Sequence, residues 1–218
     1  MLILFSLFIA VWLKAEIPRF AIRVNRQIYQ ETTSLVNIGL TEQQFLAQSL
    51  LQPKQPQSAN LFFLLFPLIM LCSENPIIGT IFILLCFLSL LDMCYYLTDI
   101  RYLVLIFLLV LWESLADFQH QTFTFTLVFC LLIGCVSQLV FKKEAFGSGD
   151  MLLLVALSPL FLLEKMLLLI LTASLLGIGY YLAYWLMKKQ KLTKLAFIPF
   201  ISTAMLLVLM LESRGINY

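Results

Sequence analysis

The chain has 218 residues, of which 62% are hydrophobic and only 12% are charged. A soluble domain normally carries about twice this charged fraction, so the composition excludes an ordinary water-soluble fold and favours a protein whose outer face contacts lipid. The formal net charge of +2 is too small to indicate a nucleic-acid partner.

Apolar runs along the chain predict eight membrane helices, and therefore an all-α, polytopic membrane protein. Several runs are shorter than the ~20 residues that cross a full hydrocarbon core. The runs at residues 61–73 and 151–163 are the weakest as independent spans, so the expected count ranges from seven to nine. In chain order the runs cover residues 2–13, 61–73, 77–97, 102–116, 121–141, 151–163, 166–187 and 195–211.

The predicted organisation has three parts. Residues 1–14 form a first membrane helix, residues 15–60 form a polar cytosolic loop, and residues 61–218 form the membrane core. The N-terminal run has no basic residues before it and no A-x-A-like site after it, so we expect a retained helix and not a cleaved signal peptide. The first part of the loop is expected to form an amphipathic helix.

The distribution of basic residues predicts the orientation of the chain. With eight alternating spans, twelve of the 14 Lys and Arg residues fall on one side, and only Lys165 and Arg214 fall on the other. Basic residues gather in cytosolic loops of membrane proteins. Both chain ends are therefore expected to face away from the cytosol.

The five cysteines do not predict a disulfide framework or a zinc site. All of them lie within or at the edge of apolar runs, and no two form a C-x-x-C pair. Cysteines in such positions usually act as small hydrophobic side chains packed between helices. We expect no metal and no cofactor. The cysteines are Cys72, Cys86, Cys94, Cys130 and Cys135.

Two carboxylates stand within or beside the apolar runs. Asp92 lies near the inner end of the third run, and Asp150 lies where the sixth run begins, so the predicted topology brings both to the same cytosolic depth. Carboxylates at such positions are costly and usually functional. Asp99 is an alternative to Asp92, but the following Ile100 and Arg101 indicate a solvated turn, so Asp92 is favoured.

The residues around Asp150 predict a turn followed by a helix. Gly147 and Gly149 allow positive φ and close backbone approach, so they are expected to form a tight turn that aims the next side chain. Asp150 would then lie at a helix N-terminus, where the helix dipole favours an ionised carboxylate. Asp92, nearer the bilayer, is expected to hold a proton. One acid and one base at a shared site suit aspartyl proteolysis.

Three segments carry a resemblance to the type IV prepilin peptidases. KKEAFGSGDMLLLVAL, which contains Asp150, resembles the GxGD segment of that family, and SLLDMCYYL, which contains Asp92, resembles its other aspartate motif. AFIPF, with Pro199 and Phe200, resembles the motif that opens the family's last helix. The similarity covers about residues 80 to 211, and it is greatest to short members that lack the cysteine-containing cytosolic domain.

The resemblance implies that Asp92 and Asp150 are a catalytic pair in the inner membrane of a bacterium. They would activate a water that cleaves a prepilin-like substrate after a glycine, at the end of a short basic leader. Gly147, Gly149, Pro199 and Phe200 would support the site. Glu144 would either orient the catalytic loop or pair with Lys142 or Lys143 at the surface. Many full-length members also methylate the new N-terminus and carry four cysteines in the first cytosolic loop. That loop has none here, which argues against methyltransferase activity.

Two other classes of function also fit an intramembrane carboxylate pair. A transporter or assembly component would use the aspartates as a proton relay, with carboxylates spread through the depth of the membrane. A presenilin-like protease would act deeper in the bilayer and carry a PAL motif, where this chain has IPF. The remaining acidic residues near apolar runs lie at outer ends or loops, which argues against a relay: Glu74, Glu113, Asp117, Glu164 and Glu212.

Overall fold

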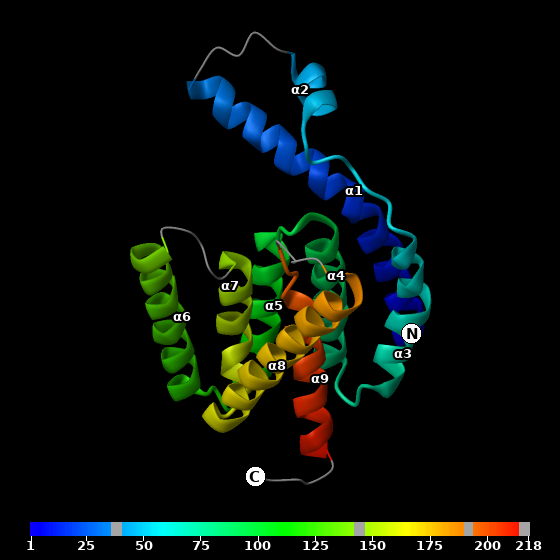
Figure 1. Ribbon diagram of the computed structural model, residues 1–218. Coiled ribbons are helices and arrows are strands. Elements are labelled where there is room, and N and C mark those ends of the chain that lie inside the picture. The colour runs from blue at the N-terminus through cyan, green and yellow to red at the C-terminus, as the bar shows by residue number, and fades with distance from the viewer. Residues whose placement is uncertain (36–40, 142–146, 190–193, 214–218) are drawn as a thin grey trace. The chain divides into compact units, whose positions relative to one another are not determined.

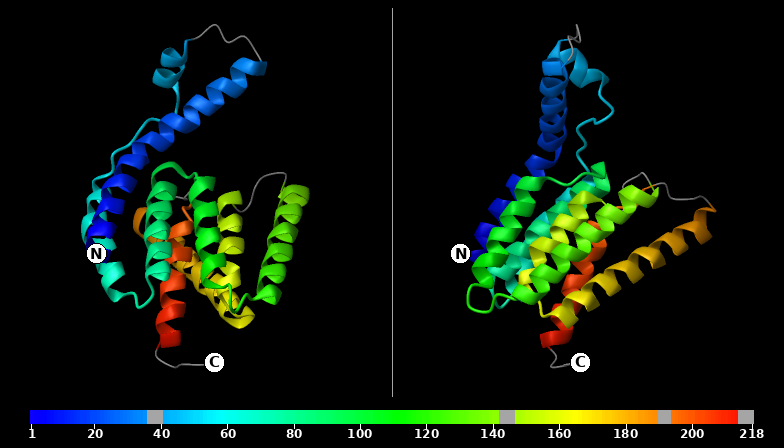
Figure 2. Two further views of the ribbon diagram at one scale, coloured as in Figure 1. Left: turned by 180° about the vertical axis from the view of Figure 1, so that it is seen from behind. Right: turned by 90° about the vertical axis from the view of Figure 1, so that its left-hand side faces the viewer.

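The computed structural model describes residues 1–35, 41–141, 147–189 and 194–213 (Figure 1, Figure 2). Within these ranges every element of regular structure is a helix, which confirms the predicted all-helical class. The chain divides into two compact units, Met1–Pro76 and Ile77–Tyr218.

The first unit is built on one long helix. Helix α1 (Leu2–Leu35) continues well past residue 14, where the sequence predicted the start of a loop, and Figure 2 shows it as one unbroken helix. The expected amphipathic helix is therefore the second half of the first helix and not a separate element. It is followed by α2 (Glu42–Gln48), a 3-10 turn η1 (Gln57–Leu61) and α3 (Phe62–Cys72).

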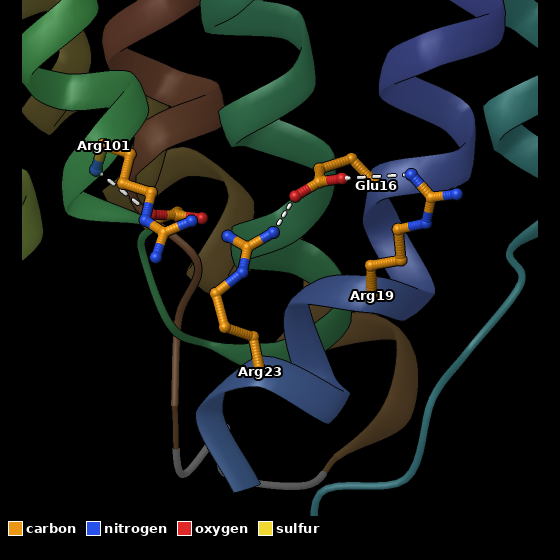
Figure 3. A network of polar contacts seen from close by, with 5 residues as sticks. Glu16, Arg19, Arg23 and Arg101 are labelled. Carbon is orange, nitrogen blue, oxygen red and sulfur yellow. Dashed lines mark hydrogen bonds and ion pairs between the residues drawn. The ribbon is translucent and has the colours of Figure 1, made fainter. Parts of the chain in front are cut away.

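A charged cluster supports the middle of α1. Glu16 is almost fully buried although it is acidic, and its carboxylate pairs with Arg23 and, at 3.9 Å, with Arg19 (Figure 3). All three side chains come from successive turns of the same helix, so they hold it together where its sequence changes from apolar to polar. This pairing explains why the helix does not end at the end of the apolar run.

The segment after α1 folds back onto it through polar contacts. The Asn25 side-chain amide donates to Ser49 Oγ at 2.9 Å and to the Leu51 carbonyl at 2.7 Å. Arg26 pairs with Glu42 at 2.8 Å between α1 and α2. Helix α3 then packs along the apolar half of α1. Much of the predicted loop 15–60 is thus an ordered helical hairpin.

The second unit contains six α-helices within the described residues. They are α4 (Pro76–Tyr95), α5 (Ile100–Glu113), α6 (His120–Phe141), α7 (Ser148–Leu157), α8 (Leu163–Lys188) and α9 (Ile198–Ser213), with a short turn η2 (Ser158–Leu160) after α7. The C-terminal end of α4 and the N-terminal ends of α7 and α9 lie toward the same end of this unit (Figure 1).

Three described helices are long and apolar enough to cross a bilayer. They span Pro76–Tyr95, His120–Leu139 and Leu163–Lys188. Other apolar helices, including α7 and α9, are shorter than the ~20 residues of a full span. These helices and the composition indicate a membrane protein with several spans, and the count of eight stays a prediction.

Candidate active site

Asp92 lies in the last turn of α4 and points toward the start of α9. Its side chain is nearly buried, with 7% of its surface exposed. Its Oδ2 accepts a hydrogen bond of 3.1 Å from the backbone N–H of Ile198, the first residue of α9. The first N–H groups of a helix have no partner within the helix, and Phe197, which precedes α9, has no oxygen in its side chain. Asp92 therefore caps α9 from another helix.

Asp150 lies in the first turn of α7, outside the three helices of spanning length. The preceding Gly147 is the N-cap residue of that helix, with φ −61° and ψ 129°, and its carbonyl accepts the N–H groups of Asp150 and Met151. This confirms the predicted place of Asp150 at a helix N-terminus. The expected positive φ is absent at Gly147.

At Gly147 and Gly149 there is no room for a Cβ atom. A Cβ on Gly147 would lie 2.7 Å from Asp150 Oδ2, so the missing side chain leaves room for the carboxylate. A Cβ on Gly149 would lie 2.4 Å from Thr98 Oγ1, because the start of α7 packs directly on the segment after α4. Both distances are shorter than any van der Waals contact. Gly149 therefore lets the start of α7 approach the segment that follows α4, and Gly147 leaves room for the Asp150 carboxylate.

Asp92 and Asp150 are coupled electrostatically. Burial, and then the negative charge of Asp92, raise the pKa of Asp150 to about 7. A charge has this effect only at short range inside a protein. The contact of Gly149 with Thr98 and the bond from Ile198 to Asp92 independently bring α7 and α9 to the same end of α4. Both aspartates therefore lie toward the end of α4 at which α7 and α9 begin.

The raised pKa of Asp150 differs from what we expected for this residue. The dipole of α7 was expected to keep Asp150 ionised and burial to keep Asp92 protonated. Asp92 accepts the backbone N–H of Ile198 at the start of α9. Burial and the Asp92 charge outweigh the dipole of α7 at Asp150. Asp150 is therefore partly protonated near neutral pH.

Asp99, the alternative to Asp92, has a local structural function. It is the N-cap residue of α5, and its Oδ1 accepts the backbone N–H of Arg101 at 3.1 Å. Its side chain is buried, while Ile100 and Arg101, which were expected in a solvated turn, are exposed at the start of α5. An aspartate at an N-cap is ordinary in helices. This contact favours Asp92 as the partner of Asp150.

The remaining predicted site residues form the support around the start of α9. Pro199 is the second residue of α9, where its missing N–H breaks no helical bond. The ring of Phe200 lies 5.7 Å from that of Tyr180 on α8. Gly177 on α8 lies against Phe197, since a Cβ there would be 3.3 Å from that ring. Glu144 lies outside the described residues.

Sequence reasoning missed three features of the site. The capping N–H belongs to Ile198, whose side chain has no polar group to attract notice. Ser89 on α4 and Ser202 on α9 are joined by a hydrogen bond of 2.9 Å. Tyr96 ends α4 with a φ of 53°, the left-handed region that bulky residues rarely adopt. Only the spacing of Ser89, three residues before Asp92, gave a usable signal.

A cavity of about 190 Å³ lies at the end of α4, and its lining includes Met93, the residue after Asp92, but not Asp92 itself. This volume is below the about 300 Å³ of the smallest drug-sized pockets, but an engineered cavity of about 150 Å³ holds benzene, so it suits one side chain. The lining comes from the end of α4, from α8 and from the start of α9: Met93, Tyr96, Tyr180, Lys194, Leu195, Ala196, Pro199 and Phe200. Among the described residues, no group of three His, Cys, Asp or Glu side chains could hold a metal ion.

Comparison with known proteins identifies one match. Residues 79–182 match the sequence model of a protein family described as the type IV leader peptidase family. The matched stretch contains both Asp92 and Asp150 and ends within α8. No curated protein and no solved structure gives a significant match to the chain.

Proposed function

We propose that this chain, whose residues 79–182 match the type IV leader peptidase family, is an aspartic endopeptidase that removes the leader of prepilin-like membrane proteins. The observation that carries this proposal is the electrostatic coupling of Asp92 and Asp150. Aspartyl proteolysis needs two carboxyl groups close enough to share a proton and a water. The family match supports the reaction, and the coupling supports the identity of the catalytic residues.

The proposed mechanism divides the work between the two carboxyl groups. Ionised Asp92 accepts a proton from a water, whose oxygen attacks the carbonyl carbon of the scissile peptide bond. Protonated Asp150 donates its proton to the carbonyl oxygen, so no free oxyanion forms. The tetrahedral intermediate then collapses, and its C–N bond breaks as the amine receives the proton that Asp92 had taken up. Asp150 regains its proton from the hydroxyl group of the intermediate.

The proposed substrate enters from the cytosolic face of a bacterial inner membrane. Prepilin-like proteins carry a short basic leader followed by an apolar helix, so the helix would lie in the bilayer and the leader in the cytosol. The distribution of Lys and Arg supports an orientation with the ends of α4 and α7 that carry the aspartates at that face and both termini in the periplasm. Membrane lipid is then the second partner of the protein.

Replacement of either aspartate tests the proposal. Asp92→Asn and Asp150→Asn should each abolish cleavage of a co-expressed prepilin, measured as the loss of the shorter product on a gel. Asp117→Asn is the matched control, because Asp117 is exposed in the turn between α5 and α6, and it should cleave normally. Membrane fractionation shows whether each variant is inserted. Cleavage by both site variants at the wild-type rate would refute the assignment.

A further inference from the structure

Helices α4 and α9 contact each other through two polar bridges near the proposed active site. The first joins Asp92 Oδ2 to the Ile198 N–H at 3.1 Å. The second joins the hydroxyls of Ser89 and Ser202 at 2.9 Å. Both belong to the second unit, and no catalytic function has been assigned to either serine.

The two bridges are one helical turn apart on both helices. Ser89 lies three residues before Asp92 and Ser202 lies four residues after Ile198, so each pair shares a face of its helix. The end of α4 lies at the beginning of α9, so the two helices run in opposite directions. The spacing from Ser89 to Asp92 on α4 therefore matches the spacing from Ser202 back to Ile198 on α9. With a rise of about 1.5 Å per residue, the bridges lie about 5 Å apart along the contact. Together they define the register of α9 against α4.

Each of the two bridging hydroxyls also lies within hydrogen-bond distance of a carbonyl in its own helix. Ser89 Oγ also lies 2.7 Å from the Leu85 carbonyl, and Ser202 Oγ lies 2.9 Å from the Ile198 carbonyl. Two hydroxyl hydrogens can fill only two of these three contacts, so one serine donates to the other while the second donates to the carbonyl in its own helix. The bond to the Ile198 carbonyl ties Ser202 to the residue whose N–H reaches Asp92.

We propose that Ser89 and Ser202 are positioning residues for Asp92, because their hydrogen bond holds the first turn of α9 in the register that places the Ile198 N–H on the carboxylate. The inference rests on the proposed function, since it assigns Asp92 a catalytic task that depends on this geometry. Without the bridge, α9 rotates or slides, and Asp92 loses its backbone donor. In this proposal the serines act through Asp92.

Single and double alanine variants measure the effect of the bridge. Ser89→Ala and Ser202→Ala should each lower kcat by about tenfold or more, because a displacement of about 1 Å at a catalytic group has effects of up to about a hundredfold. KM should stay within about twofold. The double variant should be no slower than the slower single variant, since both remove one shared bond. Ser89→Thr restores a hydroxyl and should recover most of the activity.

The pH profile separates positioning from a general loss of stability. The Ile198 N–H stabilises the ionised form of Asp92, so its loss should move the acid limb of kcat/KM to higher pH. Asp150 on α7 is the group whose charge couples to Asp92, and α9 has no ionisable side chain before Glu212. Hydrogen exchange of the peptide 197–202 should rise in both alanine variants, which reports the freed helix end without any substrate.

Thr203→Val is the matched control. Thr203 is the neighbour of Ser202 on α9, and its hydroxyl bonds only carbonyls of its own helix, Pro199 and Phe200, at 3.0 Å. This variant should keep kcat, the pH profile and the exchange of residues 197–202. The inference about the serines would be overturned, without affecting the proposed function, by either of two results. The serine variants of an active enzyme could cleave at the wild-type rate, or the losses of activity of the two single variants could multiply in the double variant. A wild-type protein that cleaves no prepilin would instead refute the proposed function.

Discussion

Asp92 caps a helix that begins 106 residues further along the chain, through the hydrogen bond of 3.1 Å from the Ile198 N–H to its Oδ2. The residues at the start of α9 are apolar and include no side chain that could cap it locally. In a bilayer, a helix end without partners for its N–H groups is costly. The same carboxylate therefore stabilises the fold and is held in a fixed orientation for chemistry.

This double function predicts different outcomes for two substitutions of Asp92. Asp92→Asn keeps an oxygen that accepts the Ile198 N–H, so it should lose activity and keep stability. Asp92→Ala removes the cap as well and should lower the free energy of unfolding by about 1 kcal/mol. Thermal unfolding in detergent, compared with cleavage of a prepilin, measures both effects. Equal stability of the two variants would show that the capping bond contributes nothing.

The raised pKa of Asp150 predicts an alkaline limb in the activity profile. Asp150 must be protonated to donate to the carbonyl oxygen, and its pKa is about 7. Activity should therefore fall as the pH rises through about 7. A pH–rate profile of the wild-type protein measures this limb. Constant activity from pH 6 to about 9 would contradict the role of Asp150 as the acid.

The same group predicts how stability depends on pH. The folded protein binds the Asp150 proton more tightly than the unfolded chain, whose pKa is near 3.8. The stabilisation from this proton is complete below the unfolded value and is lost as the pH rises through about 7. Asp150→Asn cannot ionise, so its melting temperature should fall less than that of the wild type over this interval. Asp117→Asn, exposed in a turn, should follow the wild type.

Two glycine-to-alanine substitutions should have opposite effects. Gly149→Ala places a Cβ within 2.4 Å of Thr98 Oγ1, so α7 must move away from the end of α4. Overpacking of this kind costs about 1–3 kcal/mol, and the movement should also reduce cleavage. Gly179→Ala on α8 meets no atom within 4 Å and should be neutral or stabilising by up to about 1 kcal/mol.

Thermal unfolding and cleavage assays of the two alanine variants measure this difference. Thr98→Gly removes the side chain that the new methyl group would meet, so the double variant Thr98→Gly, Gly149→Ala should regain part of the lost activity. If Gly149→Ala behaves like Gly179→Ala, the close approach of α7 to Thr98 is wrong.

Two helices end in a residue that glycine would suit better. Tyr96 after α4 and Lys189 after α8 have φ values of 53° and 51°. The left-handed conformation costs a residue with a Cβ about 1 kcal/mol, and glycine adopts it freely. Lys189→Gly should therefore raise the free energy of unfolding by up to about 1 kcal/mol. Tyr96→Gly should gain less, because its ring also lines the cavity at the end of α4.

A comparison of the two variants by thermal unfolding isolates the contribution of the Tyr96 ring. Tyr96→Gly should also change cleavage more than Lys189→Gly, which lies at the far end of α8. A larger gain in stability for Tyr96→Gly than for Lys189→Gly would show that the ring makes no favourable contact.

The sequence by itself determined the features that depend on local composition. A run of apolar residues can only be stable in lipid or in a core, so the helical membrane class followed from composition. A carboxylate beside such a run is costly wherever the chain folds, so Asp92 and Asp150 stood out without a structure. The need for glycine next to Asp150 was also visible, although its reason was not.

Only the tertiary structure decided the features that depend on neighbours distant in the chain. The cap on α9, the fit of Gly149 against Thr98 and the serine bridge each join residues that no local pattern relates. The raised pKa of Asp150 differs from the local expectation of an ionised carboxylate, because burial and the charge of Asp92 exceed the effect of the α7 dipole. Electrostatic and steric effects depend on distances in space, and helix packing sets those distances.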